Sequence, residues 1–448
     1  MIIEIPSQVN TALQILSANG YEAYVVGGAV RNCLMSITAA DWDVTTSALP
    51  EQTKEAFSDY KVIETGIKHG TVTVIIDSFH VEITTFRVDG EYSDNRRPDF
   101  VKFTSSLTDD LSRRDFTCNA IAYSPLCGFK DPFGGMKDIE SKLLRCVGEP
   151  DERFGEDALR ILRALRFSRT LGFEIDPALS ESIHKNVSLL SNISYERITA
   201  ELFKTLPNAS AAFLNEYSDV IFQIIPELKA EKGCEQNHER HIYDVWRHTC
   251  VSVENCPPDP GIRLAALLHD IGKPSCKTTD ENGVDHFCGH EQAGAEIARA
   301  VLNRMKVSNA VKNKTLTLVE HHSMMPEKMS KKSLRKYIGS LGEETMRDIF
   351  ALREADLKAQ NPAFIDQTLK EAGEGVKNFE EALAGVKCFK ITDLEVNGSE
   401  LISEGIESGP ALGKILSRLF DEVISDGLEN KKDVLIKRAK EIYEDGNS

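Results

Sequence analysis

The sequence predicts an α+β N-terminal part, in which helices accompany a mixed sheet, followed by a long all-α region. Two observations lead to this prediction. Apolar and β-branched residues alternate in TVTVII (71–76) and VEITTF (81–86), which is typical of paired strands. From about residue 155 onward, apolar residues recur at helical spacing, beginning at Leu159. The length of 448 residues leaves room for about three domains.

Composition and charge limit the classes of protein to which the chain can belong. Basic residues number 53 and acidic residues 70, and the net charge of −17 argues against non-specific coating of nucleic acid. Residues 153–169 nevertheless carry five arginines against two acids, and this strip is either a solvated helix face or an RNA contact. No stretch approaches the roughly 20 apolar residues of a membrane span. The ten cysteines include no C-x-x-C pair, which suits a reducing compartment, and we expect a cytoplasmic protein.

The first elements along the chain lead into a glycine turn. A helix is predicted over 8–18, and a short strand, Tyr24–Val26, runs into Gly27-Gly28 before the next helix. A turn without Cβ atoms lets backbone N–H groups and a helix N-terminus face a phosphate. Arg31, one helical turn further on, would reach the same anion. The alternative is a simple tight turn.

Two aspartates follow the turn in the sequence AADWDV. Asp41 and Asp43 lie two residues apart, and side chains at that spacing in a strand share a face. Adjacent carboxylates repel each other unless a cation neutralises them, and their hard oxygens favour Mg²⁺ shared with a nucleoside triphosphate. The alternative is a solvated aspartate pair at a strand end. Glu82, between Val81 and Ile83, is either a third carboxylate of this site or an outward-facing strand residue.

Four further motifs follow in order. They are LSRRDFTCNAIAY (111–123), DPFGGMKDI (131–139), RFGEDALRILRALRF (153–167) and SYERITAELFKTL (194–206). With the glycine turn and the Asp-x-Asp strand, they resemble the DNA polymerase beta superfamily of nucleotidyltransferases. The closer resemblance is to its class II branch, which contains tRNA CCA-adding enzymes and bacterial poly(A) polymerases. One position departs from the pattern: Asn32 stands where the family usually has aspartate, which puts that residue's support of the turn in doubt.

The resemblance implies which residues bind the nucleotide. It places ribose recognition on Arg114, Asp115 and Asn119, whose polar groups can hydrogen-bond a 2′-hydroxyl and so separate NTP from dNTP. The alternative for this group is a buried Arg–Asp pair that holds a strand. The complete predicted nucleotide-binding set is Gly27, Gly28, Arg31, Arg114, Asp115, Asn119, Asp157, Arg160, Arg163 and Arg166.

Base recognition would fall to residues 156–160. On one helix, Asp157 and Arg160 are three residues apart and therefore neighbours. Their acceptor and donors complement the exocyclic amine and ring nitrogen that cytosine and adenine share. Uracil and guanine would instead place a carbonyl against the carboxylate, and such a mismatch is rejected strongly. Taken alone, Glu156 fits an ordinary surface ion pair; the motif series favours a role in base recognition.

A histidine-rich segment forms a second candidate site. Eight of the eleven histidines lie between residues 238 and 322. The pattern resembles the HD domain of metal-dependent phosphohydrolases, which implies that His248, His269, Asp270 and Asp356 hold one or two divalent metals. Three more histidines are candidates for further ligands or phosphate contacts: His290, His321 and His322. The alternative is a set of structural histidines. The sequence leaves open whether the site catalyses a reaction.

The remaining segments concern RNA. VDGEYSDNRRPDF (88–100) predicts a flexible loop, and it resembles the loop with which CCA-adding enzymes switch from C to A addition. The stretch 391–420 resembles the tail of CCA-adding enzymes that contain an HD domain. Its glycines, with Lys414 at the start of a helix, would hold an RNA phosphate or only cap that helix.

These observations predict four domains and one main activity. The predicted domains are a nucleotidyltransferase head (1–140), a helical neck that recognises the base (141–232), an HD-like domain (233–362) and a tRNA-binding tail (363–448). The predicted reaction is template-independent addition of CCA to the tRNA 3′ end from CTP and ATP, with release of pyrophosphate. It would use Mg²⁺ in the head, a divalent metal of unknown identity in the HD domain, and no membrane; the oligomeric state stays open. The alternatives are A-only or CC-only addition, poly(A) polymerase, a phosphohydrolase whose head merely binds nucleotide, and a tRNA-binding chaperone with an inactive head.

Overall fold

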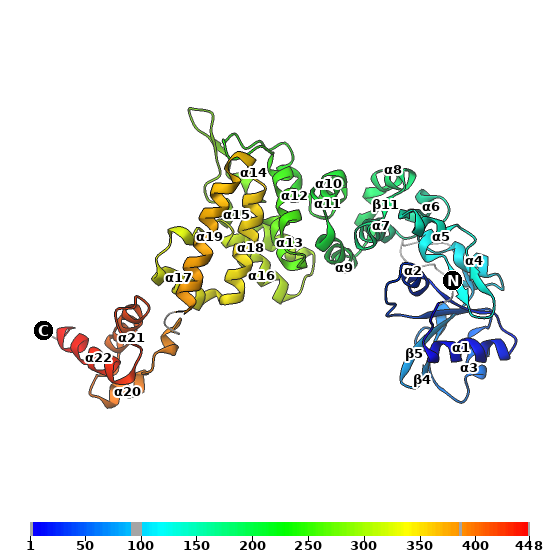
Figure 1. Ribbon diagram of the computed structural model, residues 1–448, viewed down its shortest axis with the longest axis horizontal. Coiled ribbons are helices and arrows are strands. Elements are labelled where there is room, and N and C mark those ends of the chain that lie inside the picture. Colours follow the sequence, from blue (N-terminus) through cyan, green and yellow to red (C-terminus); the bar gives the residue numbers. More distant parts are fainter. Residues whose placement is uncertain (1–2, 91–100, 385–387, 447–448) are drawn as a thin grey trace. The chain divides into compact units, whose positions relative to one another are not determined.

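The computed structural model describes residues 3–90, 101–384 and 388–446. The chain forms two compact units. Unit 1 comprises Met1–Asn208 and Tyr217–Ile224, and unit 2 comprises Ala209–Glu216 and Ile225–Ser448. Unit 1 contains a sheet with helices, whereas unit 2 is almost entirely helical (Figure 1), so the predicted order of an α+β part before a helical region is confirmed.

Unit 1 is built on a seven-stranded mixed sheet with the strand order β3-β4-β5-β2-β1-β8-β9. The central pair β2 and β5 runs parallel, and the other neighbouring strands run antiparallel. The predicted strands at 71–76 and 81–86 correspond to β4 and β5, which pair along their whole length. The strands are β1 (Ala23–Val26), β2 (Asp43–Thr46), β3 (Lys61–Ile63), β4 (Thr71–Ile76), β5 (Phe79–Thr85), β8 (Ala122–Ser124) and β9 (Gly128–Lys130).

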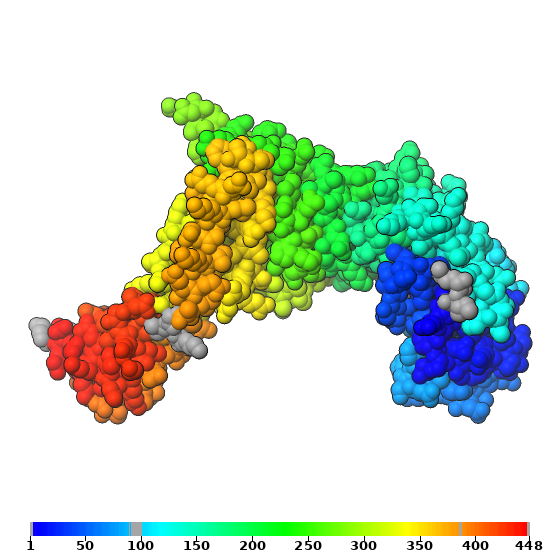
Figure 2. Space-filling model, viewed as in Figure 1, coloured from blue at the N-terminus to red at the C-terminus, as the bar shows by residue number. Residues whose placement is uncertain are grey.

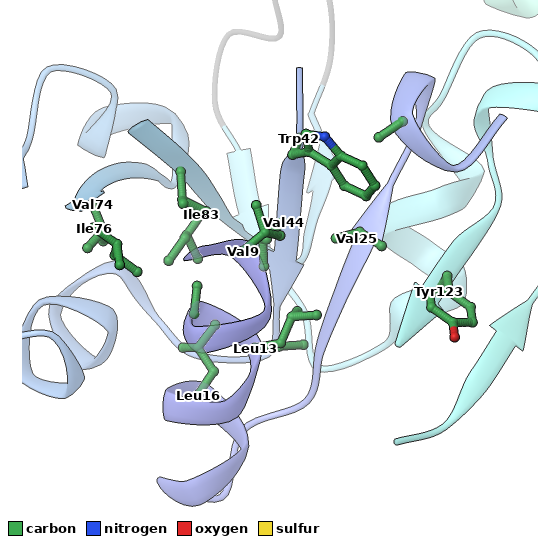
Figure 3. Packing of buried hydrophobic residues seen from close by; sticks show 14 of the residues in the cluster. Val9, Leu13, Leu16, Val25, Trp42, Val44, Val74, Ile76, Ile83 and Tyr123 are labelled. Carbon is green, nitrogen blue, oxygen red and sulfur yellow. The ribbon is translucent and has the colours of Figure 1, made fainter. Parts of the chain in front are cut away.

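The apolar core of the sheet fixes which side chains face the site. Helices α1 (Ser7–Ala18) and α3 (Pro50–Ala56) pack on the sheet, and Figure 3 shows α1 lying against Val44 of β2 and Ile83 of β5. Each such buried side chain stabilises the fold by about 1.5–3 kcal/mol. Because side chains alternate along a strand, Asp43 and Glu82, each one residue earlier, project from the opposite face.

Shorter elements complete the first part of unit 1. They are α2 (Gly28–Leu34), α4 (Leu107–Ser112), the 3₁₀ turn Thr117–Asn119 and α5 (Gly135–Glu140). The predicted loop 88–100 is only partly described. Arg87–Asp89 form β6, which pairs with β7 (Val101–Phe103), and residues 91–100 lie outside the described residues.

The rest of unit 1 is mainly helical. The helices are α6 (Pro150–Glu156), α7 (Leu159–Leu171), α8 (Pro177–Asn186), α9 (Tyr195–Thr205) and α11 (Ser218–Ile224). The expectation of helix alone after residue 155 was wrong in detail. Gly172, with φ 67°, ends α7, and the strand β11 (Glu174–Ile175) then pairs in parallel with β10 (Leu143–Leu144).

Unit 2 consists of helices and one small hairpin. The helices are α10 (Ala211–Glu216), α12 (Val245–Asn255), α13 (Pro260–Leu268), α14 (Lys273–Cys276), α15 (His290–Arg304), α16 (Asn309–His321), α17 (Lys331–Leu341), α18 (Glu343–Lys358) and α19 (Pro362–Ala384). The hairpin of β12 (Thr278–Thr279) and β13 (Asp285–His286) projects from these helices (Figure 2). It is a second departure from an all-helical region.

The last part of unit 2 has a small core of its own. Helices α20 (Gly398–Ser403), α21 (Pro410–Val423) and α22 (Lys432–Gly446) pack around residues such as Leu419. Arg335 of α17 is 1% exposed and donates hydrogen bonds to the Ala382 and Ile424 carbonyls and to Asp426. Lys414 is exposed on the first turns of α21. No helix in the described part of the chain is both long and apolar enough to cross a membrane.

Candidate functional site

One cavity of unit 1 collects the predicted nucleotide-binding residues. Its volume is about 490 Å³, and Asp43 also lines it. All ten residues of the predicted set line this cavity: Gly27, Gly28, Arg31, Arg114, Asp115, Asn119, Asp157, Arg160, Arg163 and Arg166. They come from three stretches of the chain, residues 27–31, 114–119 and 157–166. The motif order therefore predicted a real spatial grouping.

The glycine turn at the end of β1 brings the backbone close to an arginine. Gly27 has φ 72° and ψ −132°, a conformation that side-chain-bearing residues rarely adopt. A Cβ added at Gly27 would lie 3.0 Å from Arg114 Nη1. Helix α2 begins directly after it, and its last turn carries Arg31, which is 8% exposed. The turn thus places backbone N–H groups and two guanidinium groups around one wall of the cavity.

Asp43 lines this cavity, and the carboxylates of Asp41 and Glu82 lie near Asp43. The sequence predicted both aspartates in one strand, but the strand begins at Asp43 and Asp41 lies two residues before it. The alternation still holds, because Trp42 is buried while Asp41 and Asp43 are exposed. Glu82 is also exposed and lies directly beside Asp43 in the parallel register of β2 and β5.

The charge around Asp43 is unbalanced. Desolvation in the cleft and the carboxylates of Glu82 and Asp41 raise the pKa of Asp43, and Arg114 only partly opposes this. Hard, like-charged oxygens of this kind fit a divalent cation such as Mg²⁺. Among the described residues, the groups of three or more ligand atoms that all lie within 4.8 Å of one another are in unit 2. The oxygens of Asp41, Asp43 and Glu82 are therefore not all that close together.

A chain of hydrogen bonds between buried side chains runs along the wall of the cavity. Arg31 Nη1 donates to Asn119 Oδ1, and Asn119 Nδ2 donates to Asp115 Oδ1 over 2.9 Å. The other oxygen of Asp115 accepts two bonds from Arg163, and its first oxygen also accepts the Phe116 amide. Burial opposes ionisation, but Arg163 and these donors lower the pKa of Asp115 to about 2. All four lone-pair positions of this carboxylate are therefore used.

The predicted placement of Asp157 and Arg160 on one helix was wrong. Asp157, with φ −139° and ψ 103°, interrupts the helix between α6 and α7, so the two residues are not neighbours on one helix. Asp157 caps the Leu159 amide over 3.1 Å and accepts a bond from Arg197 over 3.0 Å. Arg160 pairs with Glu156 instead, which is the ion pair that Glu156 alone would have predicted. Asp157 and Arg160 still line the same cavity.

Four cavity residues were missed in the sequence: Arg113, Leu159, Phe167 and Arg197. Arg197 lies in the motif at 194–206, yet only its partner Asp157 was considered. Phe167 has three guanidinium groups around its ring, those of Arg31, Arg163 and Arg166, at 5.0, 5.4 and 3.9 Å from its centroid. A phenylalanine at helical spacing looks like an ordinary core residue, so only its place between two arginine-bearing turns could have marked it.

Comparison with known proteins identifies the family. The CCA-adding enzyme of Ligilactobacillus salivarius is 32% identical over 451 residues, which span 99% of this chain and 100% of that enzyme. That of Streptococcus suis is 33% identical over 453 residues and 98% of each chain. This chain belongs to the CCA-adding enzyme family. The CCA-adding enzyme of Geobacillus thermodenitrificans is 50% identical over 197 residues, or 44% of this chain.

Family models and a solved structure agree with membership of the CCA-adding enzyme family. Residues 23–145 match the model described as "Poly A polymerase head domain". Residues 172–231 match "Probable RNA and SrmB- binding site of polymerase A", and residues 286–439 match "tRNA nucleotidyltransferase domain 2 putative". The crystal structure of the Bacillus stearothermophilus CCA-adding enzyme in complex with CTP superposes with a TM-score of 0.68 at 28% identity, covering 99% of both chains.

In this member of the CCA-adding enzyme family, the predicted HD residues converge inside unit 2. His248 Nε2 lies 2.7 Å from Asp356 Oδ1, and His269 Nε2 lies 3.2 Å from Asp270 Oδ2. His248, His269 and Asp270 are at most 1% exposed, and Asp356 is 18% exposed. Burial opposes protonation, but Asp270 and Asp356 raise the pKa of His269 to about 10. The two carboxylates thus require positive charge, which a divalent cation would supply.

Of the three further histidines, two join this group and one does not. His290 Nε2 and His322 Nε2 lie 3.6 and 3.7 Å from Asp270 Oδ1. His321 instead hydrogen-bonds the Thr317 carbonyl over 3.0 Å and packs against Tyr337. A cavity of about 400 Å³ opens onto Asp270, His290, His322 and Asp356, and Lys273 also lines it.

Proposed function

We propose that this chain adds CCA to the 3′ end of tRNA without a template, taking CTP and ATP as substrates and releasing pyrophosphate. The observation that carries the proposal is the cavity that gathers all ten predicted nucleotide-binding residues beside the carboxylate of Asp43. Similarity to CCA-adding enzymes along almost the whole chain supports it. We further propose a cytoplasmic site of action, where tRNA is available, and functional boundaries at residues 140, 232 and 362.

The phosphates would be held by the glycine turn and the arginines. The backbone at Gly27 and Gly28 lines the cavity together with three guanidinium groups, those of Arg31, Arg163 and Arg166. Guanidinium groups and free backbone N–H groups are the usual ligands of phosphate. Their positive charge would also attract a triphosphate towards a protein whose net charge is −17.

Asp41 and Asp43, with Glu82 as a third candidate, would hold Mg²⁺. When bound, the ions would polarise the α-phosphate and favour ionisation of the tRNA 3′-hydroxyl that attacks it. The pKa of Asp43 supports this assignment, because burial, Glu82 and Asp41 raise it and Arg114 only partly opposes them. The residues around them would align the triphosphate with that hydroxyl.

The residues that would contact the ribose and the base differ from the residues that hold these contacting side chains in position. Because Asp115 has no free lone pair, we propose that it positions Arg163 and Asn119, and that Asn119 or Arg114 contacts the 2′-hydroxyl. We propose that Asp157, fixed by Arg197, accepts the exocyclic amine of cytosine or adenine. Arg160 would donate to the ring nitrogen.

The test is extension of tRNA that lacks its CCA end, with CTP, ATP or both. Full CCA on one protein supports the proposal. Addition of C or A alone would support a CC-only or A-only enzyme, and a long A tail would support a poly(A) polymerase. The variant Asp41→Asn/Asp43→Asn is the control, since it keeps the shape of both side chains and removes their charge.

We propose a second activity, metal-dependent hydrolysis of a phosphate ester, at the histidine–aspartate site of unit 2. Three observations support it: the convergence of His248, His269, Asp270 and Asp356, their burial, and the cavity that opens onto the two aspartates. When bound, a divalent cation there would activate a water molecule. Hydrolysis of bis(p-nitrophenyl) phosphate and p-nitrophenyl phosphate, with Mn²⁺ or Ni²⁺ added, tests the proposal. Absence of hydrolysis with every metal would refute it.

A further inference from the structure

Asp110 of α4 lies directly before the motif 111–123 and behind the wall of the nucleotide cavity. It is 0% exposed and does not line the cavity, whereas Arg113 and Arg114 do. We propose that Asp110 is a positioning residue, which sets how Arg113, Arg114 and Arg160 meet the nucleotide. The proposal rests on the nucleotide site proposed above and adds a residue that the predicted binding set does not contain.

Both oxygens of the Asp110 carboxylate have defined partners. Oδ1 accepts hydrogen bonds from Arg113 Nε over 3.0 Å and from Arg113 Nη2 over 2.9 Å. It also accepts the backbone amide of Arg87, the first residue of β6, over 3.3 Å. Oδ2 accepts the Thr45 hydroxyl over 3.1 Å and lies 3.6 Å from Arg114 Nη2. One buried carboxylate therefore joins α4 to β2, to β6 and to two arginines of the cavity.

The two arginines depend on Asp110 for charge balance. The side chains of Arg113 and Arg114 are only 17% and 19% exposed, and Asp110 forms an ion pair with each of them. Burial lowers the pKa of the Arg114 guanidinium, and Asp110 is the largest influence that opposes this. Two neighbouring guanidinium groups repel each other when no anion stands between them. Loss of the Asp110 charge would therefore move both groups.

Arg114 carries the effect of Asp110 to the ribose side of the cavity. Its Nη1 lies 3.0 Å from the position of a Cβ added at Gly27, so the guanidinium group closes on the glycine turn. Its Nε is buried without a hydrogen-bond partner among the described residues, and this donor is therefore available to a ligand. Charge-assisted hydrogen bonds are short and need good alignment. A displaced Arg114 would therefore weaken contact with a 2′-hydroxyl.

Arg113 carries the effect of Asp110 to the base side. Its carbonyl accepts a hydrogen bond from Arg160 Nη2 over 3.0 Å, while its side chain is held at two nitrogens by Asp110. The other contacts of the Arg160 guanidinium, with Glu156 and the Arg153 carbonyl, lie on α6. Release of Arg113 would thus remove the contact that holds Arg160 to the end of α4.

Thr45 extends the same arrangement to the strand of the proposed metal ligand. It stands two residues after Asp43 on β2, so the two side chains project from the same face of the sheet. Thr45 is fully buried, and its hydroxyl donates to Asp110 Oδ2. Asp110 therefore ties α4, with its two arginines, to the strand that carries Asp43.

The variant Asp110→Asn tests the proposal, because it keeps the shape of the side chain and removes its charge. In the full chain with Mg²⁺, we expect Kd for CTP and for ATP, by isothermal titration calorimetry, to rise at least about tenfold. In single-nucleotide addition to tRNA lacking CCA, the preference for CTP over dCTP and over UTP should fall by at least about threefold. A purely structural role would lower the melting temperature and leave these preferences unchanged.

The matched control is Asp109→Asn, which makes the same change one residue earlier on α4. Asp109 is exposed and accepts the Thr104 hydroxyl over 3.2 Å. Its removal should leave Kd and both preferences within about twofold of the unaltered chain, because it contacts neither arginine of the cavity. Equal changes in the two variants would contradict a specific role of Asp110.

The outcomes separate this inference from the proposed function. Unchanged Kd and unchanged preferences in folded Asp110→Asn would overturn the positioning role. If Asp110→Asn does not fold, Thr45→Val decides, since it removes one donor to Oδ2 at nearly constant volume. It should lower the preference for CTP over dCTP by about threefold, and an unchanged preference would overturn the proposal. An unaltered chain that binds CTP but extends no tRNA would refute CCA addition, while Kd for CTP would still decide the role of Asp110.

Discussion

At the scale of single residues, the surroundings of Asp43 disfavour its ionised form. Because its pKa is raised, the contribution of Asp43 to the stability of the fold is present while the carboxyl is protonated. This contribution is lost as the pH rises through that pKa. We therefore expect Asp43→Asn to abolish nucleotide addition without lowering the melting temperature at pH 7. Extension assays and calorimetry on the same sample check this. Near-normal extension would show that Asp43 holds no essential metal.

Asp115 behaves in the opposite way. Its pKa of about 2 lies below the unfolded value of 3.8, so its contribution to stability is present above the unfolded value and is lost as the pH falls towards 2. We expect Asp115→Asn to weaken both the hold on Arg163 and the discrimination between NTP and dNTP. Each lost charged hydrogen bond is worth roughly 1.5–3 kcal/mol, or about ten- to over a hundredfold.

Steady-state incorporation of CTP and dCTP, together with melting curves between pH 3 and pH 7, measures this effect. The wild-type melting temperature should fall with pH more steeply than that of Asp115→Asn. Asp151→Asn is a suitable control, because Asp151 is an ionised surface acid paired with Lys185 and does not line the cavity. Unchanged sugar discrimination in Asp115→Asn would remove Asp115 from ribose selection.

Asp157 is the residue through which base choice can be tested. Asp157→Ala should reduce use of CTP and ATP together by about ten- to a hundredfold and relax the rejection of UTP. Arg197→Ala should shift the preference in the same direction, since Arg197 holds the carboxylate over 3.0 Å. Incorporation of each NTP into tRNA lacking CCA gives the answer. If Asp157→Ala still rejects UTP fully, the base is selected elsewhere.

At the scale of elements, the glycine turn between β1 and α2 is the most constrained part of the site. Gly27→Ala would force a side chain into a left-handed conformation and place Cβ 3.0 Å from Arg114 Nη1. We expect KM for both nucleotides to rise by at least about tenfold. Gly20→Ala is the matched control, because Gly20 has φ 85° but no atom within 4 Å of an added Cβ. It should cost stability alone, and equal KM changes in both variants would contradict a role in binding.

The sequence predicted most elements near the site, and its failures have physical causes. The alternation in β4 and β5 is visible in the sequence because one face of the sheet is buried. The register that places Glu82 beside Asp43 follows from the packing of β2 and β5 against the same core. The break at Asp157 was hidden, since the leucines of α7 continue an apolar pattern that a single non-helical residue does not disturb. Arg163 and Arg166 share α7 with Phe167, but Arg31 comes from α2, and a local pattern does not reveal that contact.

At the scale of the whole molecule, the two proposed activities belong to separate units. Changing His269 and Asp270 to alanine should remove phosphate-ester hydrolysis and its metal but leave CCA addition mostly intact. The two sets of residues share no member and lie in different compact units. Parallel assays of both reactions on the double variant decide the matter. Loss of both in a folded protein would indicate that one site serves both reactions.

The buried guanidinium group of Arg335 has a consequence for truncation. Two of the acceptors of its hydrogen bonds, the Ile424 carbonyl and Asp426, lie in the turn that follows α21, whereas Arg335 itself lies on α17. A shortened chain that stops after α19 would leave this cation without those acceptors and would uncover the surface around it. Deleting a tail thought to serve only RNA would then yield an aggregation-prone protein, and lost activity in that chain would report misfolding before it reported lost RNA contact.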